Sequence, residues 1–345
     1  MDLVAYVPHH PLPGETLTAD EFATSPGGKG ANQAVACAKL SRARPTPGVE
    51  GGETARVSMV GCVGADGHGT QLQASLSSYG VDVSGVSART DLKTGVALII
   101  VDKPTGENRI VLSPGANHAL QPADVANLDL LRTTTTPTPN PTPNPPTSSD
   151  EQHLPNLLIM QLEIPFATVL AALTAARTAN VPVLLNPAPA RPLPAEAYVG
   201  LAHLVVNETE AAILADVDER VLDDERGMET VAAGFVESGV RNVIITLGGR
   251  GVYFMSKDGD GGDGGRRRGL VPAEKAVVVD TTAAGDTFVG RYALDVVGGG
   301  GGGGGAGEGG RFDIEAAVRR ANKAAAKTVE RAGAQDSIPW RDELE

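Results

Sequence analysis

Residues 277–288 read Val-Val-Val-Asp-Thr-Thr-Ala-Ala-Gly-Asp-Thr-Phe, an apolar run that passes through small residues into a segment opening with a carboxylate. A strand that enters a helix in this way leaves backbone N–H groups at the positive end of the helix, and small side chains let an anion approach them. We therefore expect Ala283, Ala284 and Gly285 to hold a phosphate and Asp286 to accept a proton from an attacking alcohol. The simpler alternative is a strand-to-helix turn with an acidic first turn.

The overall composition is that of a globular chain. Its 345 residues are 41% hydrophobic, which is enough for a sizeable core. The formal charge of −13 argues against a nucleic-acid or anionic-membrane surface, and no run of 18 apolar residues occurs. Cys37 and Cys62 are too few for a disulfide framework or a zinc site, which is typical of a reducing compartment. We expect a cytoplasmic protein, with the nucleus as the alternative, that has no membrane or nucleic-acid partner.

Four segments have a composition typical of mobile surface insertions. Sequences of this kind bury too little apolar surface to offset the entropy lost on ordering. Three arginines at 266–268 fit a solvated loop better than a nucleic-acid patch. The segments are 42–55 (Pro and Gly), 133–150 (Thr, Pro and Asn), 258–269 (Gly, Asp and Arg) and 298–310 (nearly all Gly).

Between these insertions, short β-branched runs alternate with helical patterns. This alternation predicts a single α/β domain, with a parallel sheet covered by helices on both faces and with ligands bound along the carboxyl edge of the strands. The predicted strands are 57–60, 157–162, 181–186, 203–207, 242–247 and 276–280, and the predicted helices are 165–179, 208–215, 227–239, 286–297 and 313–331.

A second pattern predicts a small antiparallel β lid on this body. The lid is formed by about residues 3–24 and 93–113. Its strands follow one another without intervening helices, and a Lys-Pro-Thr-Gly-Glu turn joins the last two. The expected lid strands are 3–7, 15–24, 95–102 and 108–113.

A second chemical motif is Gly27-Gly28-Lys29-Gly30-Ala31-Asn32, which leads into a helix. Its glycines let backbone approach a small polar ligand, and Lys29 and Asn32 supply donors for hydroxyl groups. The order of Gly and Lys and the missing Ser or Thr exclude a P-loop, and no Gly-x-Gly-x-x-Gly occurs here. A plain loop before a helix is the alternative.

Two further motifs follow predicted strands. Asn207 and Glu210 could cap the helix that starts between them, or Glu210 could hold magnesium through water while Asn207 faces a nucleotide phosphate. The strand end at Thr246 enters a glycine loop suited to close passage of a nucleotide, or else it is a tight turn. The loop comprises Thr246, Leu247, Gly248, Gly249, Arg250 and Gly251.

These motifs together resemble the sugar-kinase family of the ribokinases, adenosine kinases and B-type phosphofructokinases. Both family signatures are present, the glycine loop at 27–32 and the segment at 280–288. The resemblance runs from residue 2 to about 343, is interrupted only by the insertions, and implies a doubly wound, ribokinase-like α/β fold. Stretches that resemble the ribokinases more than their relatives are 13–16, 94–97, 114–117, 160–163, 186–190 and 333–339.

The resemblance implies roles for residues at matching positions. Asp286 matches the catalytic base, with Ala283, Ala284 and Gly285 as the anion hole. The implied sugar-binding residues are Asp2, Gly27, Gly28, Lys29, Gly30, Asn32 and Glu163. The implied nucleotide-binding residues are Asn207, Glu210, Thr246 to Gly251, Gly285 and Asn322. A potassium ion behind the anion hole is implied at Asp280, Thr282, Thr328, Arg331, Gly333 and Ser337.

One departure from the family pattern concerns the start of the sequence. Ribokinases begin with an interior apolar strand that ends in Gly-Ser-x-Asn-x-Asp, whereas the first match here is the final Asp, Asp2. We expect the native protein to carry roughly ten or more additional residues that form this strand. Without it, two strand edges would be left unpaired.

The resemblance implies ATP-dependent phosphorylation of D-ribose at its 5-hydroxyl, with ATP, Mg²⁺ and K⁺ as cofactors. Its implied partners are a small sugar and ATP, together with a second copy of the chain that forms a homodimer through the lid. The same chemistry on 2-deoxyribose is the nearest alternative. A non-catalytic sugar or nucleotide sensor is the alternative from another class.

Overall fold

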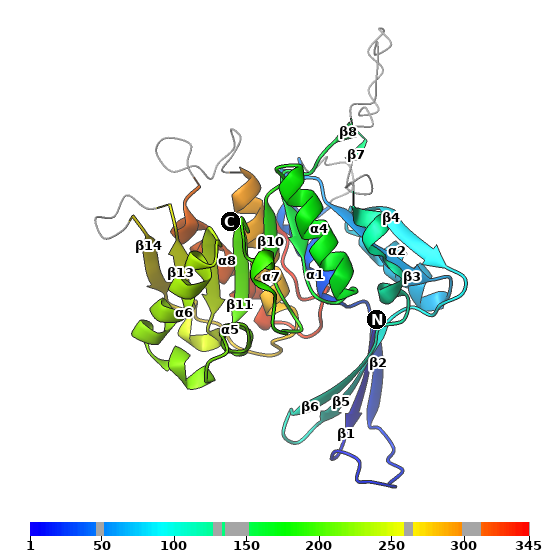
Figure 1. The fold of residues 1–345 in the computed structure, drawn as a ribbon. Helices are drawn as coiled ribbons and strands as arrows, with labels where there is room; N and C mark the ends of the chain where they lie inside the picture. Colours follow the sequence, from blue (N-terminus) through cyan, green and yellow to red (C-terminus); the bar gives the residue numbers. More distant parts are fainter. Residues whose placement is uncertain (46–51, 127–132, 135–151, 259–264, 299–311, 345) are drawn as a thin grey trace.

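The body of the protein is built on one six-stranded sheet (Figure 1). The computed structural model describes residues 1–45, 52–126, 133–134, 152–258, 265–298 and 312–344. Within these ranges no helix is both long and apolar enough to cross a bilayer. Strands β9 (Leu158–Met160), β10 (Val183–Leu185), β11 (His203–Asn207) and β12 (Asn242–Thr246) are parallel, and β13 (Val252–Ser256) and β14 (Arg267–Val271) add an antiparallel edge.

Both faces of this sheet are apolar because successive side chains point to opposite sides and each side is covered by helices. Leu185 and Leu204 face one core, whereas Leu184, Val205 and Ile244 face the other. The first core is closed by α4 (Phe166–Thr178), α5 (Glu208–Ala215) and α6 (Glu225–Glu237), and the second by α1 (Lys29–Leu40), α7 (Ala284–Gly298) and α8 (Ile314–Val329).

A separate two-stranded piece lies beside this sheet. Strands β3 (Ser58–Gly64) and β4 (Asp82–Arg89) are parallel and are connected by α2 (Gly67–Ser78). Among the described strands β3 pairs only with β4, and β9 pairs only with β10, so each has one unpaired edge.

A cavity of about 610 Å³ lies between β3 and β9. Residues 57–63 and 157–161 line it along both strands, apolar side chains from α1, α2, α4 and α7 close it, and Gly27, Gly28 and Glu163 also line it. Helices thus cover this gap on both faces, as they cover the sheet itself. The cavity therefore lies between the two strand edges that are unpaired among the described residues.

The lid is a four-stranded sheet that extends away from the body (Figure 1). Its order is β2 (Glu21–Ser25), β1 (Asp2–Val7), β5 (Val96–Asp102) and β6 (Asn108–Ser113). The outer pairs are antiparallel and the central pair, β1 with β5, is parallel.

Short elements complete the described chain. They are η1 (Gly115–Ala119), α3 (Pro122–Val125), β7 (Thr133–Thr134), β8 (Gln152–His153), η3 (Ala195–Ala197), η4 (Glu219–Asp223), η5 (Gly248–Arg250) and η6 (Arg341–Glu343).

Three sequence predictions about local structure are wrong. Residues 276–280 form no strand, because Pro272 ends the pairing and Val277–Val279 then lie exposed. The strand expected over 15–24 shrinks to β2, since its partner β1 pairs with it only from Glu21 onward. The end of the insertion at 258–269 is strand β14, where Arg268 pairs with Glu229.

Much of the other predicted insertions lies outside the described residues. This holds for 46–51 of the insertion at 42–55, for 135–150 of that at 133–150, and for 299–310 of that at 298–310.

Candidate active site

The predicted site residues gather at the carboxyl edge of the parallel strands. Glu163 follows β9, Asn186 follows β10, and Asn207 and Thr246 end β11 and β12. The helix α7 starts opposite them with Ala284, Gly285 and Asp286. Parallel strands end at a common edge, so residues far apart in sequence meet here.

Asp286 lies in the first turn of α7 and is only 8% exposed. Its two carboxylate oxygens each accept a hydrogen bond from α1. Asn32 Nδ2 donates to Oδ2 at 3.0 Å and Gln33 Nε2 donates to Oδ1 at 2.9 Å. Burial raises the pKa of Asp286, while the Lys29 charge and these two hydrogen bonds oppose the rise.

The backbone before α7 is partly arranged as expected for an anion site. Ala283 has a left-handed φ of 60°, an uncommon conformation for a residue with a side chain. Ala284, which was expected to help hold a phosphate, does not have a free amide, because its N–H donates to the Thr281 carbonyl at 3.3 Å. That bond is long, and the turn that creates it also starts the helix. The amides of Ala283 and Gly285 remain as the predicted donors.

The glycine loop packs tightly against two acidic side chains. A Cβ added to Gly27 would lie 2.0 Å from Asp2 Oδ2, so a larger residue there would displace the Asp2 carboxylate. Gly28 has a φ of 95° and precedes the first turn of α1. The Lys29 amide donates to Glu163 Oε2 at 2.9 Å. The structure thus brings the predicted sugar-binding residues Asp2, Gly27, Lys29 and Glu163 together.

Three carboxylates share this pocket with the cationic side chain of Lys29. Burial raises the pKa of Glu163, and the charges of Asp286 and Asp2 raise it further. Burial also raises the pKa of Asp2, where the N-terminal ammonium opposes the rise. Mutual repulsion and burial therefore make this cluster a good acceptor for hydroxyl donors or for a proton.

Asn207 and Glu210 form a capping box at the start of α5. Asn207 Oδ1 accepts from the Glu210 amide at 2.8 Å, and Glu210 Oε2 accepts from the Asn207 amide at 2.9 Å. The capping alternative is therefore realised. It uses one polar atom of each side chain, so the Asn207 amide nitrogen and the second Glu210 oxygen take no part in it.

The loop after β12 turns tightly through two glycines. Gly248 and Gly251 have φ values of 54° and 104°, and the Leu247 amide donates to the Gly251 carbonyl at 2.8 Å. The Arg250 side chain points to η4, where it donates to the Leu222 and Asp223 carbonyls. It also pairs with Glu208 at the start of α5. Its guanidinium is therefore engaged within the protein.

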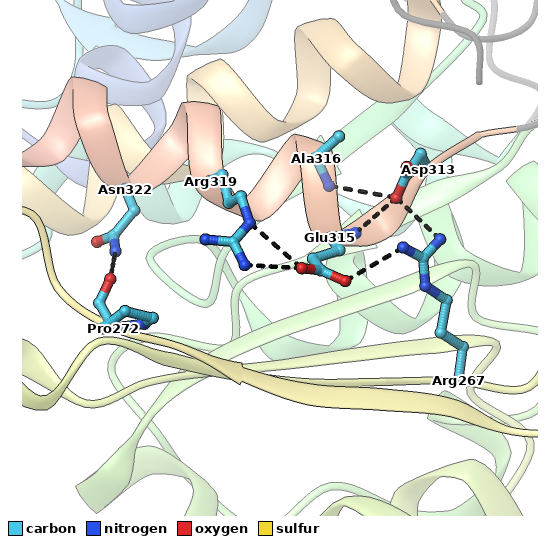
Figure 2. A network of polar contacts seen from close by, with 7 residues as sticks. All are labelled: Arg267, Pro272, Asp313, Glu315, Ala316, Arg319 and Asn322. Atoms are coloured by element: carbon cyan, nitrogen blue, oxygen red, sulfur yellow. Dashed lines mark hydrogen bonds and ion pairs between the residues drawn. The ribbon is translucent and has the colours of Figure 1, made fainter.

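Asn322 on α8 faces the segment that follows β14 (Figure 2). Its Nδ2 donates to the Pro272 carbonyl at 2.8 Å. At the N-terminal end of the same helix, Arg267 of β14 pairs with Asp313 at 2.9 Å and with Glu315 at 3.2 Å (Figure 2). These contacts fix α8 against the sheet edge, so the side chain of Asn322 has a structural partner as well as its predicted ligand role.

Five of the six residues predicted for a cation lie in two loops joined by Asp280, and the sixth, Thr328, lies in the last turn of α8. Hydrogen bonds from Thr282 and Gly333 outweigh burial and hold the pKa of Asp280 below its usual value. Gly333 has a φ of 97°. Arg331 pairs with Glu343, so of its groups only the backbone carbonyl is suited to a cation. Carboxylate, hydroxyl and carbonyl oxygens are hard donors that fit a monovalent cation.

Thr328 and Ser337 complete the predicted cation set but are engaged within the protein. The Thr328 hydroxyl donates to Thr287 Oγ1 at 3.0 Å, and the Ser337 hydroxyl donates to the Ala334 carbonyl at 2.8 Å. Both residues are buried behind the start of α7.

Sequence reasoning gave no role to three glutamines that surround Asp286 and Asn32. Gln33 contacts Asp286 directly, Gln161 contacts Gln33, and Gln335 donates to Asn32 Oδ1 at 3.3 Å. Gln33 follows directly on the glycine motif, and that adjacency was the available signal.

Comparison with known proteins adds independent information. A family model described as pfkB family carbohydrate kinase matches residues 1–341. The ribokinase of Schizosaccharomyces pombe is 40% identical over 341 residues, which are 98% of this chain and 92% of that protein. The deoxyribokinase of Salmonella typhi is 32% identical over 340 residues, again 98% of this chain and 92% of that protein.

A solved structure is similar over nearly the whole chain. It is Arabidopsis thaliana ribokinase complexed with ribose and ATP, which is 26% identical with a TM-score of 0.75. The similarity covers 99% of this chain and 94% of that one.

Proposed function

The chain belongs to the pfkB family of carbohydrate kinases, and we propose that its reaction is transfer of the γ-phosphoryl group of ATP to the 5-hydroxyl of D-ribose. The observation that carries this proposal is the place of Asp286. Its buried carboxylate lies at the start of a helix, beside the glycine loop and within the electrostatic reach of Lys29.

Asp286 acts as the general base in this proposal. As the bond between the 5-oxygen and the γ-phosphorus forms and the bond from phosphorus to the ADP oxygen breaks, the hydroxyl proton passes to the Asp286 carboxylate. The amides of Ala283 and Gly285 face the charge that spreads over the transferred group. The lid shuts water out, because water would otherwise accept the phosphoryl group and waste ATP.

The sugar is held by the acidic pocket and the glycine loop. Asp2 and Glu163 accept hydrogen bonds from sugar hydroxyls, and Lys29 and Asn32 donate to them. Gly27, Gly28 and Gly30 let the backbone lie against the sugar ring.

ATP lies along the sheet edge from Asn207 past the 246–251 loop to Asn322. The Asn207 amide nitrogen would face the phosphates, and the Glu210 oxygen outside the capping box would hold Mg²⁺ through water. Mg²⁺ neutralises phosphate charge when it is bound. Since Arg250 is engaged with η4 and Glu208, the loop contributes backbone groups rather than this side chain.

A potassium ion belongs between the loops of Asp280 and Gly333. These loops would hold it, and its positive charge would favour an anion at the turn before α7. Thr282, Thr328, Arg331 and Ser337 complete the oxygen set, with Arg331 acting through its carbonyl.

The lid also supplies a dimer surface. Phe22, Leu98 and Val111 share one lid face by register, and 64%, 46% and 63% of their surfaces are exposed. Asp2 lies on the opposite face, which borders the sugar pocket. We propose that the apolar outer face pairs with the same face of a second copy, and that the dimer works in the cytoplasm, with the nucleus as the alternative.

A coupled assay of ADP release over a panel of sugars tests the proposed reaction. We expect the highest kcat/KM with D-ribose and a lower value with 2-deoxyribose, the alternative favoured by the similarity to a deoxyribokinase. Higher kcat/KM with 2-deoxyribose would reverse the assignment of the sugar. Sugar binding without ADP release in the presence of Mg²⁺ and K⁺ would instead favour a sensor.

A further inference from the structure

Gln33 is a buried amide in contact with Asp286. It lies in the second turn of α1 and is only 1% exposed. Its Nε2 donates to Asp286 Oδ1 and to Asn186 Oδ1, both at 2.9 Å, and its Oε1 accepts from Gln161 Nε2 at 2.5 Å. Both N–H donors and the carbonyl oxygen of this side chain are therefore used.

The orientation of the Gln33 amide is fixed by its neighbours. Asn186 Nδ2 donates to the Val205 carbonyl at 2.9 Å, so Asn186 Oδ1 must face Gln33 as an acceptor. Asp286 presents a second acceptor. A flipped Gln33 amide would set its oxygen against both of these acceptors, and only one orientation satisfies every group.

These bonds form a chain from the sheet to the carboxylate. The Val205 carbonyl belongs to β11, a central strand of the body, and it orients Asn186, which orients Gln33, which holds Asp286. Asn32 holds the second carboxylate oxygen but is bonded on its far side to Gln335, in the loop after α8. Gln33 thus connects the Asp286 carboxylate, through Asn186, to the central strand β11.

We propose that Gln33 is a positioning residue that orients the Asp286 carboxylate toward the sugar hydroxyl. The proposal rests on the proposed function, because it assumes that Asp286 is the base. The Gln33 N–H occupies one lone pair of Oδ1 and leaves the others to the substrate. A donor at this oxygen also favours the ionised form, which is the form that accepts a proton.

The test is Gln33→Leu, a change of similar size that removes all three hydrogen bonds. We expect kcat to fall by about 10- to 100-fold, the order of loss that misplacement of a reacting group causes, while KM for ribose and ATP stays within a few-fold. The acid limb of kcat/KM should move to higher pH, since the carboxylate loses a stabilising donor. A side chain needed only for packing would lower thermal stability without moving that limb.

Gln73→Leu is the matched control. Gln73 on α2 donates to the Val86 carbonyl at 3.0 Å, and neither residue belongs to the proposed site. Its kcat and pH profile should equal those of the wild type.

If Gln33→Leu does not fold, Gln161→Leu serves as the test of the proposal. That change removes only the donor to Gln33 Oε1 and should move the acid limb in the same direction by a smaller amount. An unmoved limb in the variant that folds would overturn the proposal.

Titration of the Asp286 carboxyl carbon by ¹³C NMR separates this proposal from the proposed function. Even in a chain that turns over no sugar, Gln33→Leu should raise the midpoint of that titration relative to the wild type. Identical midpoints would refute the positioning role, whereas a shifted midpoint without turnover would refute only the kinase assignment.

Discussion

Asp280 Oδ2 accepts a hydrogen bond from the Gly333 amide at 2.8 Å, although 53 positions separate the two residues. The other oxygen, Oδ1, accepts from the Thr282 amide at 2.9 Å and from its hydroxyl at 2.7 Å. One carboxylate therefore ties the turn before α7 to the loop after α8. A cation held between these loops would act on the start of α7, where Asp286 lies.

Activity should therefore depend on potassium. Replacing K⁺ with tetramethylammonium at constant ionic strength should lower kcat while the melting temperature changes little, because the large ion does not fit between the two loops. Asp280→Asn should raise the K⁺ concentration that gives half-maximal activity. Equal rates in the two salts would remove the cation from the mechanism.

Asp286→Asn should abolish most of the activity without unfolding the chain. The loss of a general base typically costs about 10²- to 10⁴-fold in kcat. If Asp286 only stabilises the start of α7, the free energy of unfolding should fall by roughly 0.3–1 kcal/mol and kcat should hardly change. Steady-state kinetics and thermal melts distinguish the two, with the exposed Asp216→Asn as a control.

The pH profile should report the same carboxylate. Because the pKa of Asp286 is raised in the folded state, wild-type kcat/KM should fall on the acid side at a pH above the ordinary range of an aspartate. The wild-type profile should fall with the slope of one titrating proton. If the same fall persists in the residual activity of Asp286→Asn, another group causes it.

Val111→Asp should convert the proposed dimer into a monomer. Val111 is exposed on the outer face of the lid beside Leu98, and a charge there opposes burial against a second apolar face. Sedimentation velocity measures the change, with Ile213→Asp on α5 as a control that replaces an exposed apolar residue away from the lid. If the wild type sediments as a monomer, the lid interface is wrong.

The sequence was sufficient to predict the central strands, since β11 and β12 are largely β-branched runs bounded by polar residues. It also located the sheet edge along which Asn207 and Glu163 lie. The sequence prediction failed where the pairing with a neighbouring strand decides whether a segment forms a strand. Val277–Val279 have strand propensity but pair with no strand in the described part of the chain, whereas Arg267 and Arg268 form a strand because β13 pairs with them. The hydrogen bonds of Gln33 depend on residues from three distant segments, and no local pattern encodes them.

His203 should make stability fall in mild acid. Burial lowers its pKa to about 3, and its Nδ1 lies 2.9 Å from the Tyr292 hydroxyl. Below the ordinary pKa of about 6.5 the unfolded chain binds a proton that the folded chain rejects, so stability is lost as pH falls from about 6.5 toward 3, by up to about 1.4 kcal/mol per pH unit.

His203→Gln should reduce this slope in urea unfolding at pH 7, 6 and 5, because glutamine has no titrating group and can still bond Tyr292. His118→Gln, an exposed histidine, serves as the control. The same slope in His203→Gln and wild type would assign the acid sensitivity to other groups.

An apolar strand added before Met1 should stabilise the fold. Met1 is buried and lines the cavity between β3 and β9. Its N-terminal ammonium donates a hydrogen bond to the Gly95 carbonyl at 3.1 Å. Seven added apolar residues would run into this space, pair with both free edges and raise the melting temperature by several degrees, roughly the effect of 1–2 kcal/mol. A Gly/Ser extension of equal length is the control, and equal melting temperatures would contradict this placement.

The same cavity bears on how the protein responds to compression. A folded chain with a cavity that water fills less densely than bulk solvent occupies more space than the hydrated unfolded chain, and hydrostatic pressure favours whichever state is smaller. With about 610 Å³ between β3 and β9, this fold should denature at lower pressure than a variant in which the space is filled, even at a temperature where both are stable. The gap between β3 and β9 should thus make the stability of this protein sensitive to pressure.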